Sequence, residues 1–103
     1  MPIVNIAFQI LPIVNSKEEM YAMVDKAIEV IAQSGLKYEV CPFETVMEGE
    51  YDEVMTTIKK AQEACMEAGV EEILSYIKIQ QSKASNVSIE DKMENYRKTP
   101  SSN

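Results

Sequence analysis

Apolar and polar residues alternate from Ile3 to Leu11, a pattern that predicts a β-strand with one buried face. The apolar side of this strand carries Val4, Ile6, Phe8 and Ile10. Pro12 ends the run, and Ser16 with Glu19 forms a capping box that begins a helix. The apolar stripe of this helix consists of Met20, Val24, Ala27, Ile28 and Ile31. Gly35 then supplies the left-handed residue that commonly closes a helix.

The rest of the chain predicts a hairpin, a second helix and a fourth strand. Residues 37–41 alternate, and residues 45–48 form another short extended run that ends at Gly49. A second amphipathic helix follows, and it stops at Gly69 as the first helix stops at its own glycine. Its apolar stripe consists of Val54, Ile58, Ala61, Cys65 and Ala68. Residues 73–79 read as the fourth strand.

This order of elements predicts an α+β protein with the ferredoxin-like βαββαβ arrangement. Right-handed crossovers place both helices on one face of a four-stranded antiparallel sheet. Ser88 with Asp91 forms another capping pattern and predicts a short C-terminal helix. We expect residues 1–98 to form a single domain, and residues 99–103 to fray because they include no apolar side chain.

The sheet face that points away from the two helices is expected to be bare. It presents Ile3, Asn5, Ala7, Gln9 and Leu11 from the first strand, with Cys41 and Tyr76 as expected neighbours. A face that mixes polar and apolar groups in this way is too apolar to be left to water and too polar to be a core. We therefore expect a further copy of the chain to cover it, in a homo-oligomer.

Composition and charge exclude several classes of partner. The chain has 103 residues, with 10 Lys and Arg against 17 Asp and Glu, and its formal net charge of -7 opposes contacts with phosphates. We therefore expect no nucleic-acid partner. No apolar run is long enough to cross a bilayer, so we expect no membrane partner. Two cysteines, Cys41 and Cys65, without a histidine nearby indicate a reducing compartment, and we expect a cytoplasmic protein.

The absence of histidine limits the available chemistry. Ser-His and Cys-His nucleophiles and His-based zinc sites all require this side chain, and the sequence has none. The three glycines stand singly at the ends of elements, so no glycine-rich phosphate loop is present. We therefore expect no catalytic residue, no metal and no cofactor, and we expect the protein not to be an enzyme.

Polar residues within or beside the strands are candidates for binding a ligand. Glu48 stands next to Gly49, where the missing side chain allows a ligand or a backbone to approach closely. The alternative is that Gly49 only makes the turn into the second helix. Asn5 and Gln9 carry amides at alternate positions of a strand, and they need hydrogen-bond partners if their face is covered.

The stretch Gly35–Pro42, followed by Thr45, by Glu48-Gly49-Glu50 and by Glu53-Val54-Met55, resembles the thiamine-binding family of small proteins. The similarity to that family extends to the predicted first strand with Pro12, to residues 77–79 and to residues 88–97. The resemblance therefore covers nearly the whole chain. It implies a ferredoxin-like fold, a homotetramer, and binding of thiamine or its hydroxymethylpyrimidine part without a reaction.

The resemblance implies ligand contacts by Thr45 and Glu48, which lie in the matching stretch, and the strand pattern adds Asn5 and Gln9. Thiamine has a cationic thiazolium and an aminopyrimidine edge, which amide, hydroxyl and carboxylate groups are able to recognise. The expected ligand-binding residues are Asn5, Gln9, Thr45 and Glu48. The protein would then be a carrier, buffer or sensor of the vitamin. Three alternatives stay open: a homo-oligomeric assembly module without a ligand, a binder of a different small molecule, and an enzyme that uses carboxylates such as Glu39 and Glu48.

Overall fold

The structure is a computed structural model that describes residues 2–97. Its elements are β1 (Val4–Pro12), α1 (Lys17–Gln33), β2 (Lys37–Val40), β3 (Thr45–Gly49), α2 (Tyr51–Glu67), β4 (Ile73–Gln80) and α3 (Ile89–Met93), followed by a 3-10 turn (Glu94–Tyr96). Their order confirms the βαββαβ prediction with a short C-terminal helix. The predicted tail of residues 99–103 lies outside the described residues.

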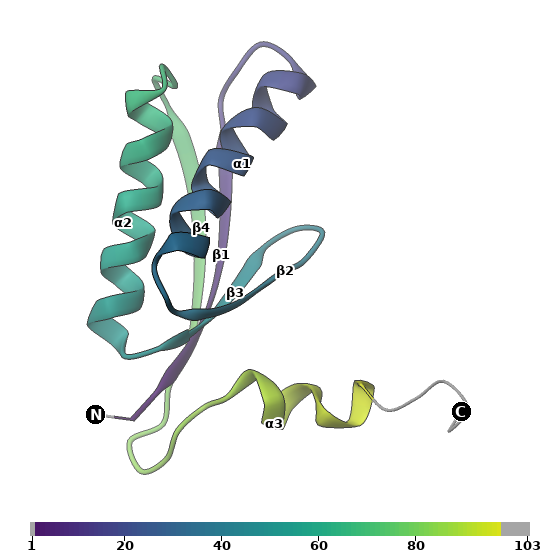
Figure 1. Ribbon diagram of the computed structural model, residues 1–103, viewed down its shortest axis with the longest axis vertical. Coiled ribbons are helices and arrows are strands. Elements are labelled where there is room, and N and C mark those ends of the chain that lie inside the picture. Colours follow the sequence, from purple (N-terminus) through teal and green to yellow (C-terminus); the bar gives the residue numbers. More distant parts are fainter. Residues whose placement is uncertain (1, 98–103) are drawn as a thin grey trace.

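The four strands form one antiparallel sheet in the order β2-β3-β1-β4, as the ferredoxin-like arrangement requires. Figure 1 shows α1 and α2 side by side across one face of this sheet. The two helices also pack against each other. Among residues 2–97, no helix combines the length and the apolar character needed to cross a membrane.

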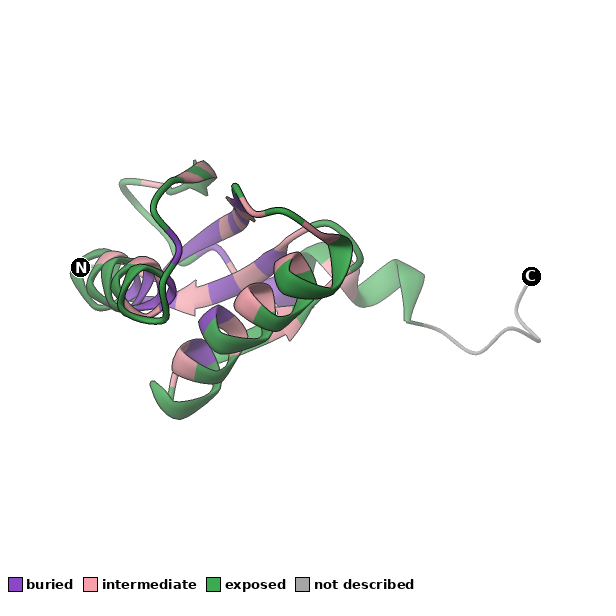
Figure 2. Cartoon of the chain, turned by 90° about the horizontal axis from the view of Figure 1, so that it is seen from above, coloured by how far each residue is buried: buried purple, intermediate pink, exposed green. Residues whose placement is uncertain are grey.

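The hydrophobic core lies between the sheet and the two helices (Figure 2). Its members come from alternate positions of β1, from β3 and from the predicted stripes of both helices. They include Val4, Ile6, Phe8, Ile10, Ala27, Ile31, Met47, Val54, Ile58, Ala61 and Cys65. The alternating pattern therefore identified the buried face of β1 correctly.

Caps and close contacts fix the ends of the helices. The Ser16 hydroxyl accepts a hydrogen bond from the Glu19 backbone N–H at 3.1 Å, so the predicted capping box begins α1. Gly35 has a φ of +83°, the left-handed conformation predicted for the end of this helix. At Gly49 a Cβ atom would lie 2.9 Å from Leu36 Cδ2 and 3.2 Å from Val54 Cγ2. Packing at the start of α2 therefore accounts for this glycine.

The two neighbours of β1 pair with it over different lengths. β4 stays in register with β1 as far as Pro12, whereas β3 reaches only the pair of Phe8 with Thr45. Beyond that pair the tip of the β2–β3 hairpin swings away from β1 (Figure 1). Along residues 9–11, the edge of β1 that faces the hairpin consequently has no strand partner among the described residues.

The face of the sheet opposite the two helices, here called the open face, is not bare along its whole length. Residues 86–97, here called the strap, cover one end of it and bury Val87 and Ile89. The expectation of a fully bare face is wrong at this end, because the strap places its own apolar side chains there. At the other end Leu74 and Tyr76 remain 47% and 55% exposed.

Candidate functional site

A cavity of about 430 Å³ opens between α1, the unpaired edge of β1 and the tip of the β2–β3 hairpin. Its size falls within the range of pockets that hold small organic ligands. The residues that line it are Phe8, Gln9, Ile10, Leu11, Met20, Tyr21, Val24, Ala27, Ile28, Ile31, Val40, Cys41, Pro42, Phe43, Glu44 and Thr45. Most of these side chains are apolar, and several belong to the core.

Polar groups in this cavity are few and come from its edges. Thr45 is 6% exposed and lies at the first position of β3, beside Phe8. Gln9 contributes from the unpaired edge of β1. Glu44 also lines the cavity, but its Oε1 lies 3.4 Å from Nζ of Lys78, which belongs to the open face. A pocket with an apolar interior and a small number of placed polar groups is typical of a ligand site.

Aromatic side chains stand at the mouth of the cavity. Phe43 at the hairpin tip is 81% exposed, and Tyr21 on the first turns of α1 is 57% exposed. Exposed aromatic rings beside a pocket are able to stack on a flat ligand and attract a cation. Cys41, which is half-buried, lies in the turn between β2 and β3 and lines the cavity.

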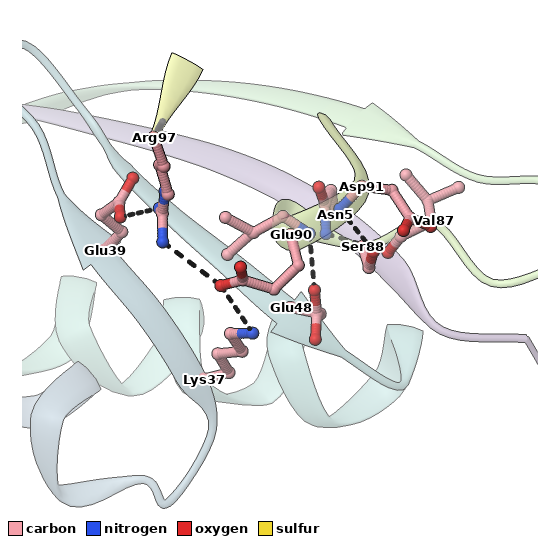
Figure 3. A network of polar contacts seen from close by, with 10 residues as sticks. Asn5, Lys37, Glu39, Glu48, Val87, Ser88, Glu90, Asp91 and Arg97 are labelled. Atoms are coloured by element: carbon pink, nitrogen blue, oxygen red, sulfur yellow. Dashed lines mark hydrogen bonds and ion pairs between the residues drawn. The ribbon is translucent and has the colours of Figure 1, made fainter. Parts of the chain in front are cut away.

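Asn5 and Glu48 lie on the open face, where they hold the strap. They are paired in register across β1 and β3. Asn5 Nδ2 donates to the Val87 carbonyl at 3.0 Å, and Glu48 Oε1 accepts from the Ile89 backbone N–H at 2.7 Å (Figure 3). A hydrogen bond to a charged group is worth more than one between neutral groups. These two side chains therefore anchor the strap at its buried part.

Ion pairs add a second, exposed set of contacts to the strap (Figure 3). Lys37 Nζ lies 3.3 Å from Glu90 Oε1, and Arg97 pairs with both Glu39 and Glu90. All four side chains are at least 38% exposed. Exposed ion pairs contribute at most about 1 kcal/mol each, so they are weaker anchors than the buried hydrogen bonds.

The structure does not bring the four predicted ligand residues together. Gln9 and Thr45 line the cavity, whereas Asn5 and Glu48 lie under the strap. For Thr45 and Glu48 the reason is the alternation of side chains along β3, whereas Gln9 shares the face of Asn5 and reaches the cavity at the unpaired edge of β1. Thr45 is in register with Phe8 on the helix side, and Glu48 is in register with Asn5 on the open face.

Sequence reasoning missed two features of these regions. Tyr21 was not singled out, although it follows Met20 of the apolar stripe and so stands at the edge of that stripe. The covering role of the strap was missed as well. Its signal was the pair of apolar residues Val87 and Ile89 around the helix-capping Ser88, in a segment that is otherwise mostly polar.

Burial raises the pKa of the Cys65 thiol above its ordinary value, and the nearby Lys26 ammonium offsets part of this shift. Cys65 Sγ lies 3.4 Å from the Met23 carbonyl oxygen in the core. A buried thiol with a raised pKa reacts slowly, because the thiolate is the nucleophile. In the part of the chain from Pro2 to Arg97, no three His, Cys, Asp or Glu residues are grouped so that they could hold a metal ion.

The fold and the cavity define a small ferredoxin-like protein with a ligand-sized pocket at the unpaired edge of its central strand. The family of thiamine-binding proteins matches residues 6–97, and the chain belongs to this family. This finding confirms the resemblance seen in the sequence.

Individual relatives agree with this assignment. A UPF0045 protein from Clostridium perfringens is 42% identical over 93 residues, which are 90% of this chain and 96% of that protein. A domain of unknown function from Bacillus cereus is 43% identical, has a TM-score of 0.87, and is matched over 93% of this chain and 91% of its own. A Thermotoga maritima protein, provisionally described as a thiamine biosynthesis/salvage protein, is 29% identical, with a TM-score of 0.85 over 93% of this chain and 100% of its own.

The anchoring role of Glu48 leads to a prediction about the strap. In the Glu48→Ala variant the Ile89 N–H loses its charged acceptor. Its hydrogen exchange, followed by NMR, should accelerate by about tenfold or more. Glu48→Gln keeps an acceptor oxygen and should have a smaller effect. Glu90→Ala removes only exposed ion pairs and serves as the control. Unchanged protection of Ile89 in Glu48→Ala would contradict the anchoring role.

Proposed function

We propose that the protein binds thiamine, or its hydroxymethylpyrimidine part, in the cavity beside α1 and that it does so without catalysing a reaction. The description of its family as thiamine-binding supports this function, as does the description of the Thermotoga maritima relative. The observation that carries the proposal is the cavity of about 430 Å³, which combines an apolar interior, an aromatic mouth and the unpaired edge of a strand.

The chemistry of the cavity fits the two rings of thiamine. The aminopyrimidine is flat, and its edge carries an amine donor and ring-nitrogen acceptors. The Thr45 hydroxyl is able to donate and to accept, and the unpaired backbone along residues 9–11 offers further N–H and C=O groups. The cationic thiazolium suits the faces of Tyr21 and Phe43 at the mouth. A chain with a net charge of -7 also favours a cationic ligand.

This proposal uses two of the four residues predicted from the sequence. Gln9 and Thr45 are in place to contact a ligand in the cavity. Direct contact by Asn5 and Glu48 stays a prediction, and it would require the strap to leave the open face, since both side chains are engaged by its backbone. In the cell, such a protein would serve as a cytoplasmic carrier, buffer or sensor of the vitamin.

Self-association is a second part of the proposal, and the open face supports it. Leu74 and Tyr76 expose about half of their surface at the end that the strap leaves free. Apolar side chains gathered on one face commonly mark an interface. We infer a homo-oligomer, with the tetramer as the expected form. The same surface would serve an assembly module that binds no ligand, so ligand binding and assembly need separate tests.

Thiamine should raise the melting temperature of the protein. A ligand that binds only the folded state stabilises by about 2.7 kcal/mol at a hundredfold excess over its Kd. About 1 kcal/mol shifts the melting point of a domain of this size by roughly 4–8 °C, so the effect is readily measured. Thr45→Val removes the hydroxyl in the cavity and should reduce the shift.

The control for this experiment is Thr57→Val, which removes a buried hydroxyl from α2 away from the cavity. It should lower the stability of the free protein but leave the thiamine shift intact. Protein concentration must be held constant because the melting of an oligomer depends on it. A flat response of the unmodified protein to millimolar thiamine and to its pyrimidine part would overturn the proposed function.

Cysteine alkylation should locate the ligand. Cys41 lines the cavity and is half-buried, whereas Cys65 is fully buried with a raised pKa. In the native protein iodoacetamide should therefore modify Cys41 before Cys65. Thiamine in the cavity should slow the reaction of Cys41 several-fold, as measured by mass spectrometry. If thiamine raises the melting point without protecting Cys41, the ligand binds elsewhere.

Assembly should depend on the free end of the open face. Light scattering at micromolar concentration should give a mass above that of the monomer, and Leu74→Lys should lower it. Met66→Lys is the matched control, since Met66 on α2 is 49% exposed and Leu74 is 47% exposed. A monomer mass for the unmodified protein, or an equal effect of both variants, would argue against this interface.

A further inference from the structure

The two edge strands of the sheet differ in how well they are protected from pairing with another chain. β2 at one edge has four residues, of which Lys37 and Glu39 are charged, and Pro42 follows it closely. β4 at the other edge has eight residues without a proline, and Lys78 is its single charged residue. Short length, charged side chains and prolines are the features that keep sheet edges from pairing. β2 has all three features, whereas β4 has only the one lysine.

Apolar side chains extend along both faces of β4. Ile77 and Ile79 on the helix side remain exposed, as do Leu74 and Tyr76 on the open face. A groove of about 500 Å³ lies between α2 and β4, and Met55 and Ile77 are among the residues that line it. The second helix therefore leaves the outer margin of this strand uncovered.

The backbone of β4 also has a row of outward-pointing hydrogen-bonding groups. The Ile13 N–H donates to the Glu72 carbonyl at 2.9 Å, across the register of β1 with β4. Because these groups alternate in direction along a strand, Tyr76 and Lys78 turn toward β1 as Glu72 does. The N–H and C=O groups that point away from the sheet belong to Ile73, Ser75, Ile77 and Ile79. Within residues 2–97, β1 is the only strand that pairs with β4.

The charges around β4 are complementary to themselves when two copies of the strand run antiparallel. If Ser75 of one copy lies opposite Ser75 of the other, Glu72 lies opposite Lys78 on the open face. A twofold axis creates this pair twice, because an interface between identical surfaces repeats every contact. Opposite charges across neighbouring strands stabilise their pairing. A shift by two residues moves Lys78 opposite Leu74 or Val70 and loses both ion pairs, so the charges favour the register centred on Ser75.

The same register matches the apolar side chains on both faces. Leu74 lies opposite Tyr76 on the open face, and Ile73 lies opposite Ile77 on the helix side. A second β4 therefore covers the exposed isoleucine beside the groove at α2, and it packs an aliphatic chain against an aromatic ring. The backbone groups of Ile73 and Ile77 both point outward, so these residues are able to exchange the hydrogen bonds of an antiparallel pair.

We propose that two copies of the chain join through the outer edges of β4, so that their two sheets form one continuous antiparallel sheet centred on Ser75. This inference rests on the proposed self-association and adds to it an interface that is distinct from the open face. The edge contact builds a dimer. Two such dimers that stack through their open faces form a closed tetramer with two kinds of twofold interface.

Amide hydrogen exchange of the full chain, followed by NMR, tests the edge directly. In the assembled protein the N–H groups of Ser75 and Ile77 should be protected to a degree comparable with that of Tyr76, whose N–H turns toward β1. Association through the open face alone leaves the outward groups in water. Ser75 and Ile77 would then exchange about tenfold or more faster than Tyr76, and that result would exclude the edge contact.

Ser75→Pro should reduce the mass of the assembly about twofold in light scattering. The substitution removes an outward N–H and breaks no bond to β1, and proline is tolerated at such positions of edge strands. Ser75→Ala is the matched control, because it loses only the hydroxyl that accepts a hydrogen bond from Gln62 Nε2 at 2.9 Å. This control should keep the mass of the unmodified protein.

Charge reversal tests the register without a proline. Lys78→Glu and Glu72→Lys each place like charges opposite each other, and each should weaken the assembly about tenfold or more in a dilution series. The double variant restores opposite charges and should regain most of the loss. Lys78 also forms an ion pair with Glu44. If the double variant regains nothing, Lys78 acts through Glu44 and the proposed register is wrong.

These outcomes separate the edge contact from the proposed function. An unchanged mass in Ser75→Pro would overturn the edge contact, and a lower mass in Leu74→Lys would then leave the open face as the interface. A monomer mass for the unmodified protein would remove both interfaces. Thiamine binding would still stand or fall by the melting experiment, since the cavity lies beside α1 and not at the edge of β4.

Discussion

β1 pairs with β4 as far as Pro12 but with β3 only as far as Phe8, and the candidate site follows from this difference. Where the pairing with β3 stops, the hairpin separates from β1 and the space between them becomes the cavity against α1. Where both pairings persist, three strands present a continuous surface around Ala7. The same strand therefore supplies an unpaired edge beside α1 and a flat, three-stranded surface around Ala7.

The strap divides the open face into two parts with different chemistry. At one end Asn5 and Glu48 hold its backbone, and its own apolar side chains replace a partner subunit as cover. At the other end Leu74 and Tyr76 stay exposed. A chain with a small core gains stability when apolar surface is covered, whether by a segment of its own or by another copy of the chain. The strap thus leaves the end of the face with Leu74 and Tyr76 uncovered.

Much of the fold was predictable because its signals are local. The alternation along β1, the capping box at Ser16 and the closing glycine at Gly35 each follow from contacts within a few residues, and the structure has all three. The strap could not be placed in the same way. Its position depends on hydrogen bonds such as Asn5 to Val87, between residues 82 positions apart, and no periodic pattern encodes such a contact.

The candidate site was only partly predictable, because closeness in sequence does not mean closeness in space within a strand. Thr45 and Glu48 are three positions apart, and an odd spacing puts two side chains on opposite faces of a sheet. Asn5 and Gln9 share a face, but four residues of strand separate them by about 13 Å. Residues that look like one ligand site in the sequence therefore lie on both faces of the sheet. Those that line the cavity are the ones at the position where the pairing of β1 with β3 ends.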